Sequence, residues 1–165
     1  MLSRILILTE AGSKIGFGHL TRCSAIKNYL EDNSFKVDLI VNNKGGLIPN
    51  LDCENIDWIN IKPDFFVDKY KIIIIDSYLV TESWLLRLKN KHTIIVHIDD
   101  YNRIVYPVDL IVNPNVFLES LDYSNQTTKY IGGPDYLILR KPFRLKKERS
   151  IYDGKPRLLI TLGGS

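Results

Sequence analysis

Short apolar runs recur along the chain, with polar or helical segments between them. Most are apolar at consecutive positions and rich in Ile, Val and Leu, which is typical of strands buried on both faces of a parallel sheet. The predicted strands are Ile5–Leu8, Val37–Val41, Ile72–Ile75, Thr93–Ile98, Leu110–Val112 and Leu158–Leu162. Weaker strand patterns lie at residues 56–61 (IDWINI) and 128–133 (TKYIGG).

Helical patterns lie between these runs. One apolar stripe predicts a helix over about residues 19–31 and consists of Leu20, Cys23, Ile26 and Leu30. A second helix is predicted over residues 81–91, where Thr81 suits the N-cap and Glu82 suits the first turn. Strands that alternate with helices predict an α/β fold with an open, mostly parallel, Rossmann-like sheet.

The end of the sequence changes character. Residues 141–155 are polar and charged, as in a linker, although the basic run at 140–149 could also bind an anion. The segment PRLLITLGGS then reads as a buried strand followed by a glycine turn of the kind that opens a helix. We therefore expect an amino-terminal domain over residues 1–150, with a linker and the first strand of a truncated second domain over 151–165. A final strand of the first sheet is the alternative.

Composition narrows the class of protein. The chain has 165 residues, 45% of them hydrophobic and 25% charged, which fits one domain of ordinary size with its own core. A net charge of +3 is too weak to indicate a nucleic-acid partner. The two cysteines lack metal-ligand spacing, and neither a signal peptide nor a membrane span is recognisable. We expect a cytoplasmic protein.

A glycine-rich loop, SKIGFGHLTRC, follows the first predicted strand and precedes the first helix. Its spacing, counted from Gly12, is G-x-x-x-G-x-G, which is neither the dinucleotide fingerprint nor the P-loop. The second strand ends in LIVNN and lacks the acidic residue that would bind a ribose hydroxyl. NAD and ATP are therefore disfavoured as ligands.

His19 stands where this loop meets the helix. Loops at the carboxyl ends of parallel strands form the ligand crevice of such sheets, and glycines let the backbone approach a ligand. An imidazole there could take a proton from water or from a hydroxyl, or His19 could simply cap the helix or pack at its start. Arg22 lies one turn further on the same face, and it could bind a phosphate or carboxylate or be solvated.

Acidic residues end two of the predicted strands. Asp76 ends one strand, and Asp99 and Asp100 end the next. In a parallel sheet these carboxylates would lie on the same rim as His19, where they could accept hydrogen bonds from sugar hydroxyls, orient His19 or activate water. For any single one of them, turn and capping chemistry is the simpler explanation. Tyr78 could stack or donate a hydrogen bond at this rim.

Three further polar residues carry weaker signals. His97 lies within a strand pattern and is expected to be a core histidine whose hydrogen bonds are satisfied. Asn113 and Asn115 belong to an Asn-Pro-Asn turn after another strand, and either could reach the crevice.

Taken in order, several segments resemble a known family. They are IGFGHLTRC, IIDSY, HIDD, NPN, GGPDYLILRKPF and LLITLGGS, and together they cover essentially the whole chain. The family is the UDP-sugar hydrolases of pseudaminic acid biosynthesis, which cleave UDP-2,4-diacetamido-2,4,6-trideoxy-β-L-altropyranose. It has the glycosyltransferase-B architecture, in which two Rossmann-like domains face each other across a cleft.

The resemblance implies a function for this chain. It would be the amino-terminal half of the enzyme, with His19 as the base that activates water to attack the anomeric carbon, and UDP would leave with inversion. No cofactor or metal is implied, and a missing carboxy-terminal domain would supply most of the nucleotide site. The residues expected to bind the UDP-sugar are Gly16, Phe17, Gly18, Arg22, Asp76, Tyr78, Asp99, Asp100, Tyr136 and Arg140.

The sequence departs from the family at Ser77, where the family often has a histidine, so a substrate contact is expected to differ. Two other functions stay open on the sequence alone. One is a UDP-sugar-dependent glycosyltransferase of the same architecture, in which a sugar hydroxyl replaces water. The other is a module that binds a nucleotide sugar without catalysis.

Overall fold

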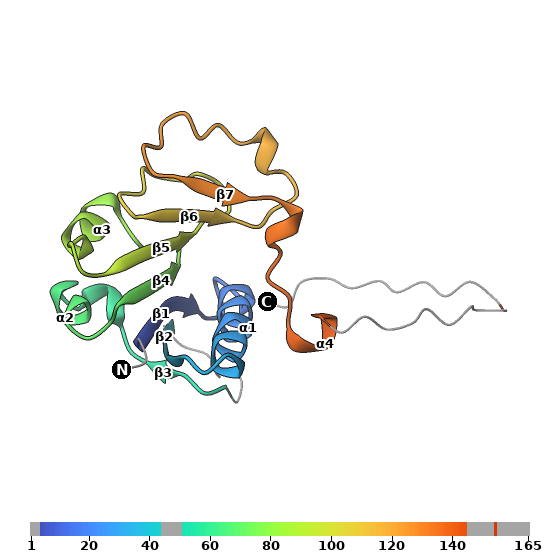
Figure 1. Cartoon of the computed structure of the whole chain (residues 1–165), viewed down its shortest axis with the longest axis horizontal. Coiled ribbons are helices and arrows are strands. Elements are labelled where there is room, and N and C mark those ends of the chain that lie inside the picture. The colour runs from blue at the N-terminus through green and yellow to red at the C-terminus, as the bar shows by residue number, and fades with distance from the viewer. Residues whose placement is uncertain (1–3, 44–50, 145–153, 155–165) are drawn as a thin grey trace.

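Seven parallel strands form one open sheet at the centre of the molecule. The computed structural model describes residues 4–43, 51–144 and 154. Its strand order is β3-β2-β1-β4-β5-β6-β7 (Figure 1). The strands are β1 (Arg4–Ala11), β2 (Lys36–Asn43), β3 (Glu54–Asn55), β4 (Ile72–Asp76), β5 (Ile94–Ile98), β6 (Leu110–Asn113) and β7 (Tyr130–Gly132). The predicted α/β class with a parallel, Rossmann-like sheet is confirmed.

Helices cover both faces of the sheet. The longest, α1 (Gly18–Asp32), lies on one face, and α2 (Asp64–Val67) and α3 (Glu82–Leu88) lie on the other (Figure 1). A fourth short helix, α4 (Lys141–Arg144), lies on the same side as α1. Three 3₁₀ turns lie at Trp58–Asn60, Leu118–Ser120 and Pro134–Tyr136.

The interior strand β1 shows why the sheet needs helices on both sides. Ile5 and Ile7 pack into one apolar cluster with Leu20 of α1. Leu6 and Leu8 point the other way, into the larger cluster that includes side chains of α2 and α3. All four are at most 2% exposed, which is the burial that a run of consecutive apolar residues predicts.

Most predicted elements are present, with small changes at their ends. The helix predicted over 19–31 is α1, and the weak strand pattern at 128–133 forms β7. The helix predicted over 81–91 ends earlier, at Leu88, and begins as expected, because the Thr81 side chain accepts a hydrogen bond from the Trp84 amide.

The strand predicted at 56–61 is wrong. The chain there forms only the two-residue strand β3 before this segment and then the 3₁₀ turn at Trp58–Asn60. The physical reason is Trp58, which is fully buried and donates its indole N–H to the Thr9 carbonyl at 2.6 Å. A turn places this large ring against the core, whereas an extended strand would spread the neighbouring apolar side chains over two faces.

Some predictions fall outside the described residues. These are the domain boundary at 150, the linker beyond Arg144 and the strand at 158–162. Within the described ranges, no helix has the length and apolar character needed to cross a bilayer.

The topology creates a crevice at one edge of the sheet. The chain moves outward from β1 to β2 and β3, then returns to place β4 on the other side of β1. The connections that leave β1 and β4 therefore diverge at their carboxyl ends. Ligands of open α/β sheets bind at such a switch point, and β1 leads there directly into the glycine-rich loop and α1.

Candidate functional site

The glycine-rich loop is a tight turn that aims the first turn of α1 at the sheet edge. Gly12 and Gly16 exchange two backbone hydrogen bonds, of 2.7 and 3.3 Å. Gly16 has a φ of +79°, a conformation that glycine adopts without strain. The closed turn leads directly into α1 and places His19 in the first turn of the helix.

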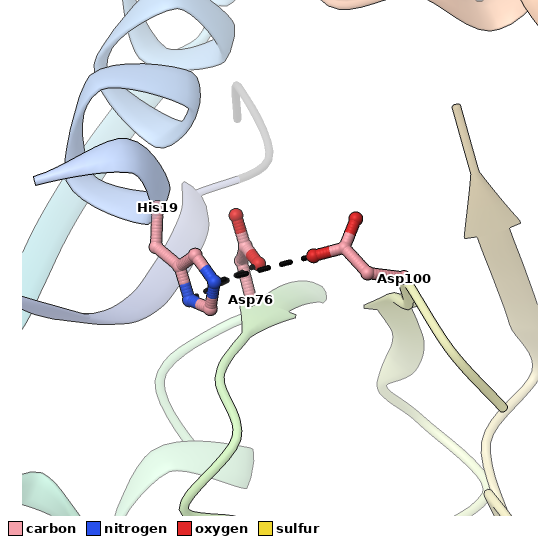
Figure 2. Close-up of side chains that lie close together, drawn as sticks. All are labelled: His19, Asp76 and Asp100. Carbon is pink, nitrogen blue, oxygen red and sulfur yellow. Dashed lines mark ion pairs between the residues drawn. The ribbon is translucent and has the colours of Figure 1, made fainter. Parts of the chain in front are cut away.

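His19 points into a group of carboxylates at the edge of the sheet (Figure 2). Its Nδ1 lies 3.6 Å from Asp76 Oδ1 and 3.9 Å from Glu10 Oε1, and its Nε2 lies 4.0 Å from Asp100 Oδ2. Its Nδ1 is buried and makes no hydrogen bond to the described residues, and the side chain is 11% exposed. The ring is therefore surrounded by negative charge at distances that suit an ion pair once the imidazole takes a proton.

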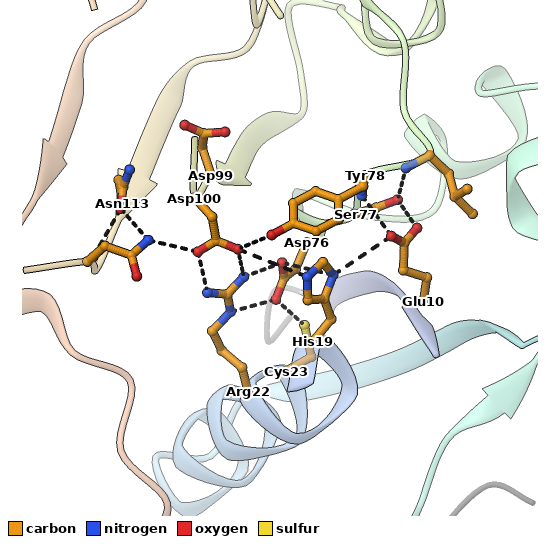
Figure 3. Close-up of polar contacts among 12 residues, drawn as sticks. Glu10, His19, Arg22, Cys23, Asp76, Ser77, Tyr78, Asp99, Asp100 and Asn113 are labelled. Carbon is orange, nitrogen blue, oxygen red and sulfur yellow. Dashed lines mark hydrogen bonds and ion pairs between the residues drawn. The ribbon is translucent and has the colours of Figure 1, made fainter. Parts of the chain in front are cut away.

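Arg22 binds two of these carboxylates at once (Figure 3). It donates to both oxygens of Asp76, at 2.8 and 2.6 Å, and to both oxygens of Asp100, at 2.8 and 3.1 Å. Burial opposes the charge of the guanidinium, but the hydrogen bonds that it donates to both carboxylates, and their negative charge, raise the pKa of Arg22. The hydrogen bonds of Arg22 thus connect α1 to the ends of β4 and β5.

Of the neighbouring acids at the end of β5, only Asp100 faces His19. Burial alone would raise its pKa, but the hydrogen bonds and charge of Arg22 lower it to about 2, and Asn115 and Tyr78 add hydrogen bonds. Asp99 turns into the interior, where it is 2% exposed and accepts hydrogen bonds from the hydroxyls of Tyr106 and Tyr123. The structure does not bring Asp99 to the candidate site.

Tyr78 forms one wall of the site. Its ring packs edge-on against His19, with centroids 4.5 Å apart and an angle of 80° between the planes. Its hydroxyl donates to Asp100 Oδ2 at 2.8 Å. Burial and this hydrogen bond raise the pKa of the Tyr78 phenol, so it stays protonated near neutral pH.

The two asparagines have different roles. Asn115 reaches the site and donates its amide to Asp100 Oδ1 at 2.9 Å. Asn113 is fully buried and contacts the Tyr123 hydroxyl and Asn115 behind the site. Asn115 is therefore the member of the Asn-Pro-Asn turn that lies next to the carboxylates.

Glu10 is the residue of this site that the sequence did not single out. It is fully buried near the end of β1, accepts from the Ser77 hydroxyl at 2.5 Å and accepts from the Tyr78 amide at 2.8 Å (Figure 3). The only signal was its position: a glutamate at the end of an otherwise apolar strand, directly before the glycine loop.

His97 is buried in the sheet, as predicted, but its hydrogen bonds are not all satisfied. Its ring stacks on Tyr106 at 4.2 Å, and its Nδ1 has no hydrogen-bond partner among the described residues. Burial lowers the pKa of His97 to about 3, so the ring is neutral at physiological pH. It packs as a core residue.

A cavity of about 660 Å³ opens beside the His19 group. It lies between the start of α1 and the segment 137–143, and it brings together four of the predicted binding residues, namely Phe17, Gly18, Arg22 and Arg140. A Cβ added to Gly18 would meet no atom within 4 Å, so the backbone there is open to a ligand. Tyr136 lies just before this segment in a 3₁₀ turn and is 44% exposed.

The ligand atoms of His19, Asp76 and Asp100 lie within 4.8 Å of one another, close enough to bind a metal ion. The carboxylates, however, already receive four hydrogen bonds from Arg22. A cation would have to displace the guanidinium or share the carboxylates with it, at a cost in electrostatic repulsion. The arrangement suits a base held among fixed charges better than a metal centre.

The similarity of this chain to known proteins is limited. The chain matches no family model. A protein of Methanocaldococcus jannaschii, named "Uncharacterized protein MJ1062", is 28% identical over 98% of this chain. The match covers 37% of that protein, so the chain spans just over a third of the length of this relative.

Proposed function

We propose that this chain carries the base of a UDP-sugar hydrolase that cleaves a nucleotide-linked amino sugar at its anomeric carbon. The observation that supports this most directly is the setting of His19. Its imidazole lies at the switch point of the sheet, with Nδ1 buried toward two carboxylates. A histidine whose one nitrogen faces a carboxylate and whose other nitrogen stays basic is the usual arrangement of a general base.

In the proposed reaction, His19 Nε2 takes a proton from water as the water oxygen bonds to the anomeric carbon. The bond between that carbon and the β-phosphate oxygen breaks, and its electron pair leaves with UDP. Attack on the face opposite UDP inverts the configuration. The imidazolium then returns its proton to solvent, so no metal or cofactor enters the step.

The surrounding residues suit a sugar and a diphosphate. Asp100 and Tyr78 offer an acceptor and a hydroxyl beside the imidazole, and both are held in place. The adjoining cavity combines the open backbone at Gly18 with the cationic side chain of Arg140. Amides at the start of a helix and a guanidinium both favour phosphate oxygens. In this proposal, a carboxy-terminal domain of the whole protein supplies the rest of the UDP site.

The reaction is tested with the full-length protein and a UDP-linked diacetamido-trideoxy sugar in H₂¹⁸O. We expect UDP release without any acceptor, ¹⁸O on the anomeric carbon and not on phosphate, and no loss of rate with EDTA. His19→Asn should remove turnover while substrate binding persists, and the matched control His92→Asn, an exposed histidine, should keep it. Turnover by His19→Asn at the wild-type rate would refute the proposal.

The same assay separates hydrolysis from glycosyl transfer. A transferase of this architecture would release UDP only when a sugar acceptor is added. UDP release that depends on an acceptor would therefore reject the hydrolase and favour the transferase. Substrate binding without any turnover, with or without acceptors, would favour the binding module.

A further inference from the structure

Glu10 differs from the other carboxylates near His19 in what neutralises it. Asp76 and Asp100 each receive two hydrogen bonds from the guanidinium of Arg22. The hydrogen bonds to the Glu10 carboxylate come from neutral donors, the Ser77 hydroxyl and the Tyr78 amide. Among the described residues, the one basic side chain within ion-pair distance of Glu10 is His19.

Because Glu10 is buried, the lack of a cationic partner has a larger energetic effect than it would have at the surface. Glu10 is 0% exposed, and a buried carboxylate without a cationic partner is unfavourable. Three carboxylates surround His19, and the guanidinium of Arg22 pairs with two of them, Asp76 and Asp100. Glu10 and Asp76 face Nδ1, whereas Asp100 faces Nε2. Because Arg22 does not neutralise Glu10, the charges favour the N–H of His19 on Nδ1.

We propose that Glu10 is a positioning residue that holds the proton of neutral His19 on Nδ1, and so keeps Nε2 free to act as the base. This role rests on the function proposed above. When His19 takes a proton from water, Glu10 and the new imidazolium form the ion pair that the resting site lacks. The proton stays on the imidazole and Glu10 stays ionised, as the acidic member of a hydrolase triad does.

Glu10 also restrains the orientation of the His19 ring, through its contacts with residues that follow β4. Its Oε1 accepts from the Tyr78 amide, and the Tyr78 ring packs edge-on against the imidazole. Its Oε2 accepts from the Ser77 hydroxyl, which itself accepts from the Leu79 amide at 2.9 Å. Through these two hydrogen bonds, the Ser77 hydroxyl connects Glu10 to the backbone at Leu79 and helps to orient the carboxylate.

The test measures the tautomer of His19 directly, apart from any turnover. The full-length protein is labelled with ¹⁵N-histidine, and the His19 signals are assigned by their loss in His19→Asn. We expect the wild type to hold the neutral ring with Nδ1 protonated. In Glu10→Gln, which keeps the size and the acceptor oxygen but removes the charge, the proton should distribute between Nδ1 and Nε2.

Kinetics give the second measurement. Glu10→Gln should lower kcat by about 10²-fold or more, the usual contribution of a general base, with KM nearly unchanged. Glu10→Asp keeps the charge on a shorter side chain and should recover part of kcat and the Nδ1–H tautomer. The matched control Asp99→Asn removes the charge of a buried carboxylate that faces Tyr106 and Tyr123, and it should leave the tautomer of His19 as in the wild type.

The outcomes separate this role from a purely structural one. A wild-type tautomer in Glu10→Gln overturns the proposal even if kcat falls, because a structural defect alone explains that result. If Glu10→Gln fails to fold, Glu10→Asp decides: loss of the Nδ1–H tautomer despite the retained charge overturns the role, and retention supports it. A wild-type protein that does not cleave the UDP-sugar refutes the proposed function, whereas the tautomer measurement still reports on Glu10.

Discussion

Arg22 is the residue on which the shape of the candidate site depends most. It joins α1 to the ends of β4 and β5, and its side chain is only 18% exposed. Replacing it with Met leaves Asp76 and Asp100 close together without their shared cation. We expect Arg22→Met to lower the free energy of unfolding by about 3 kcal/mol, measured by urea denaturation at pH 7.

Two further variants serve as comparisons for the loss of stability expected in Arg22→Met. Arg22→Lys keeps the charge but loses the planar fork that binds both carboxylates, so its stability should fall between wild type and Arg22→Met. Arg4→Met breaks a pair with Asp38 whose arginine side chain is 55% exposed, and its effect should be much smaller. An Arg22→Met protein as stable as Arg4→Met would contradict the structural role of Arg22.

Asp100 should make the fold sensitive to acid. Its folded pKa of about 2 lies below the ordinary value of 3.8, so the ionised carboxylate stabilises the folded state. That contribution, of roughly 2 kcal/mol, is complete above the unfolded pKa and is lost as the pH falls through the folded one. Urea denaturation from pH 6 to pH 2 should therefore show a shallower decline in Asp100→Asn than in wild type. Parallel curves would show that Asp100 is not held as the structure indicates.

At the scale of elements, two glycines between β1 and α1 have different structural roles. Gly16 needs its positive φ to close the turn, so Gly16→Ala should lower the free energy of unfolding by roughly 1 kcal/mol. Gly18 begins the helix with open space where a Cβ would stand. Gly18→Ala should fold at least as stably as wild type, because alanine favours a helix.

The same two variants test the cavity beside His19. Because the methyl group of Gly18→Ala would stand in that cavity, we expect a raised KM for the UDP-sugar in a protein of unreduced stability. Urea denaturation and steady-state kinetics on the full-length protein measure the two effects separately. A wild-type KM in Gly18→Ala would place the substrate elsewhere.

The elements were predictable wherever one physical rule dominated. Consecutive apolar residues identified β1, β2, β4, β5 and β6, because a strand covered on both faces needs them. The apolar pattern gave a wrong prediction at Trp58. The backbone there forms a turn because the large indole ring fits into the core, and the spacing of apolar residues contains no information about that fit. Helix α3 was predicted from its cap and shortened at its other end, where no cap is recognisable in the sequence.

The site was predictable as a location and only in part as a set of residues. The rule that strand ends share a rim placed His19, Asp76 and Asp100 together. Adjacent residues such as Asp99 and Asp100 face opposite ways, and sequence alone does not say which faces inward. Glu10 was missed because its significance lies in contacts with Ser77 and Tyr78, which are distant in the chain.

At the scale of the whole molecule, the sheet order explains why distant segments meet. Placing β4 beside β1 brings Glu10 and Asp76 to one edge, and β5 adds Asp100 on the next strand end. The first two turns of α1 then supply His19 and Arg22 to the same edge. His19, Arg22 and the three carboxylates thus come from one sheet and the helix that follows β1.

Because the residues around His19 all belong to this chain, we can predict how the isolated chain behaves. Residues 1–165 should fold on their own, since two apolar clusters already cover both faces of the sheet, and His19 should keep its neighbours. The chain spans 37% of the length of the archaeal relative, and the function proposed above assigns most of the UDP site to a carboxy-terminal domain. If such a domain supplies that site, the isolated chain should show a cooperative thermal transition but no measurable UDP release. Adding the separately expressed remainder should restore cleavage. Turnover by the isolated chain at the rate of the whole protein would place the complete site within these 165 residues.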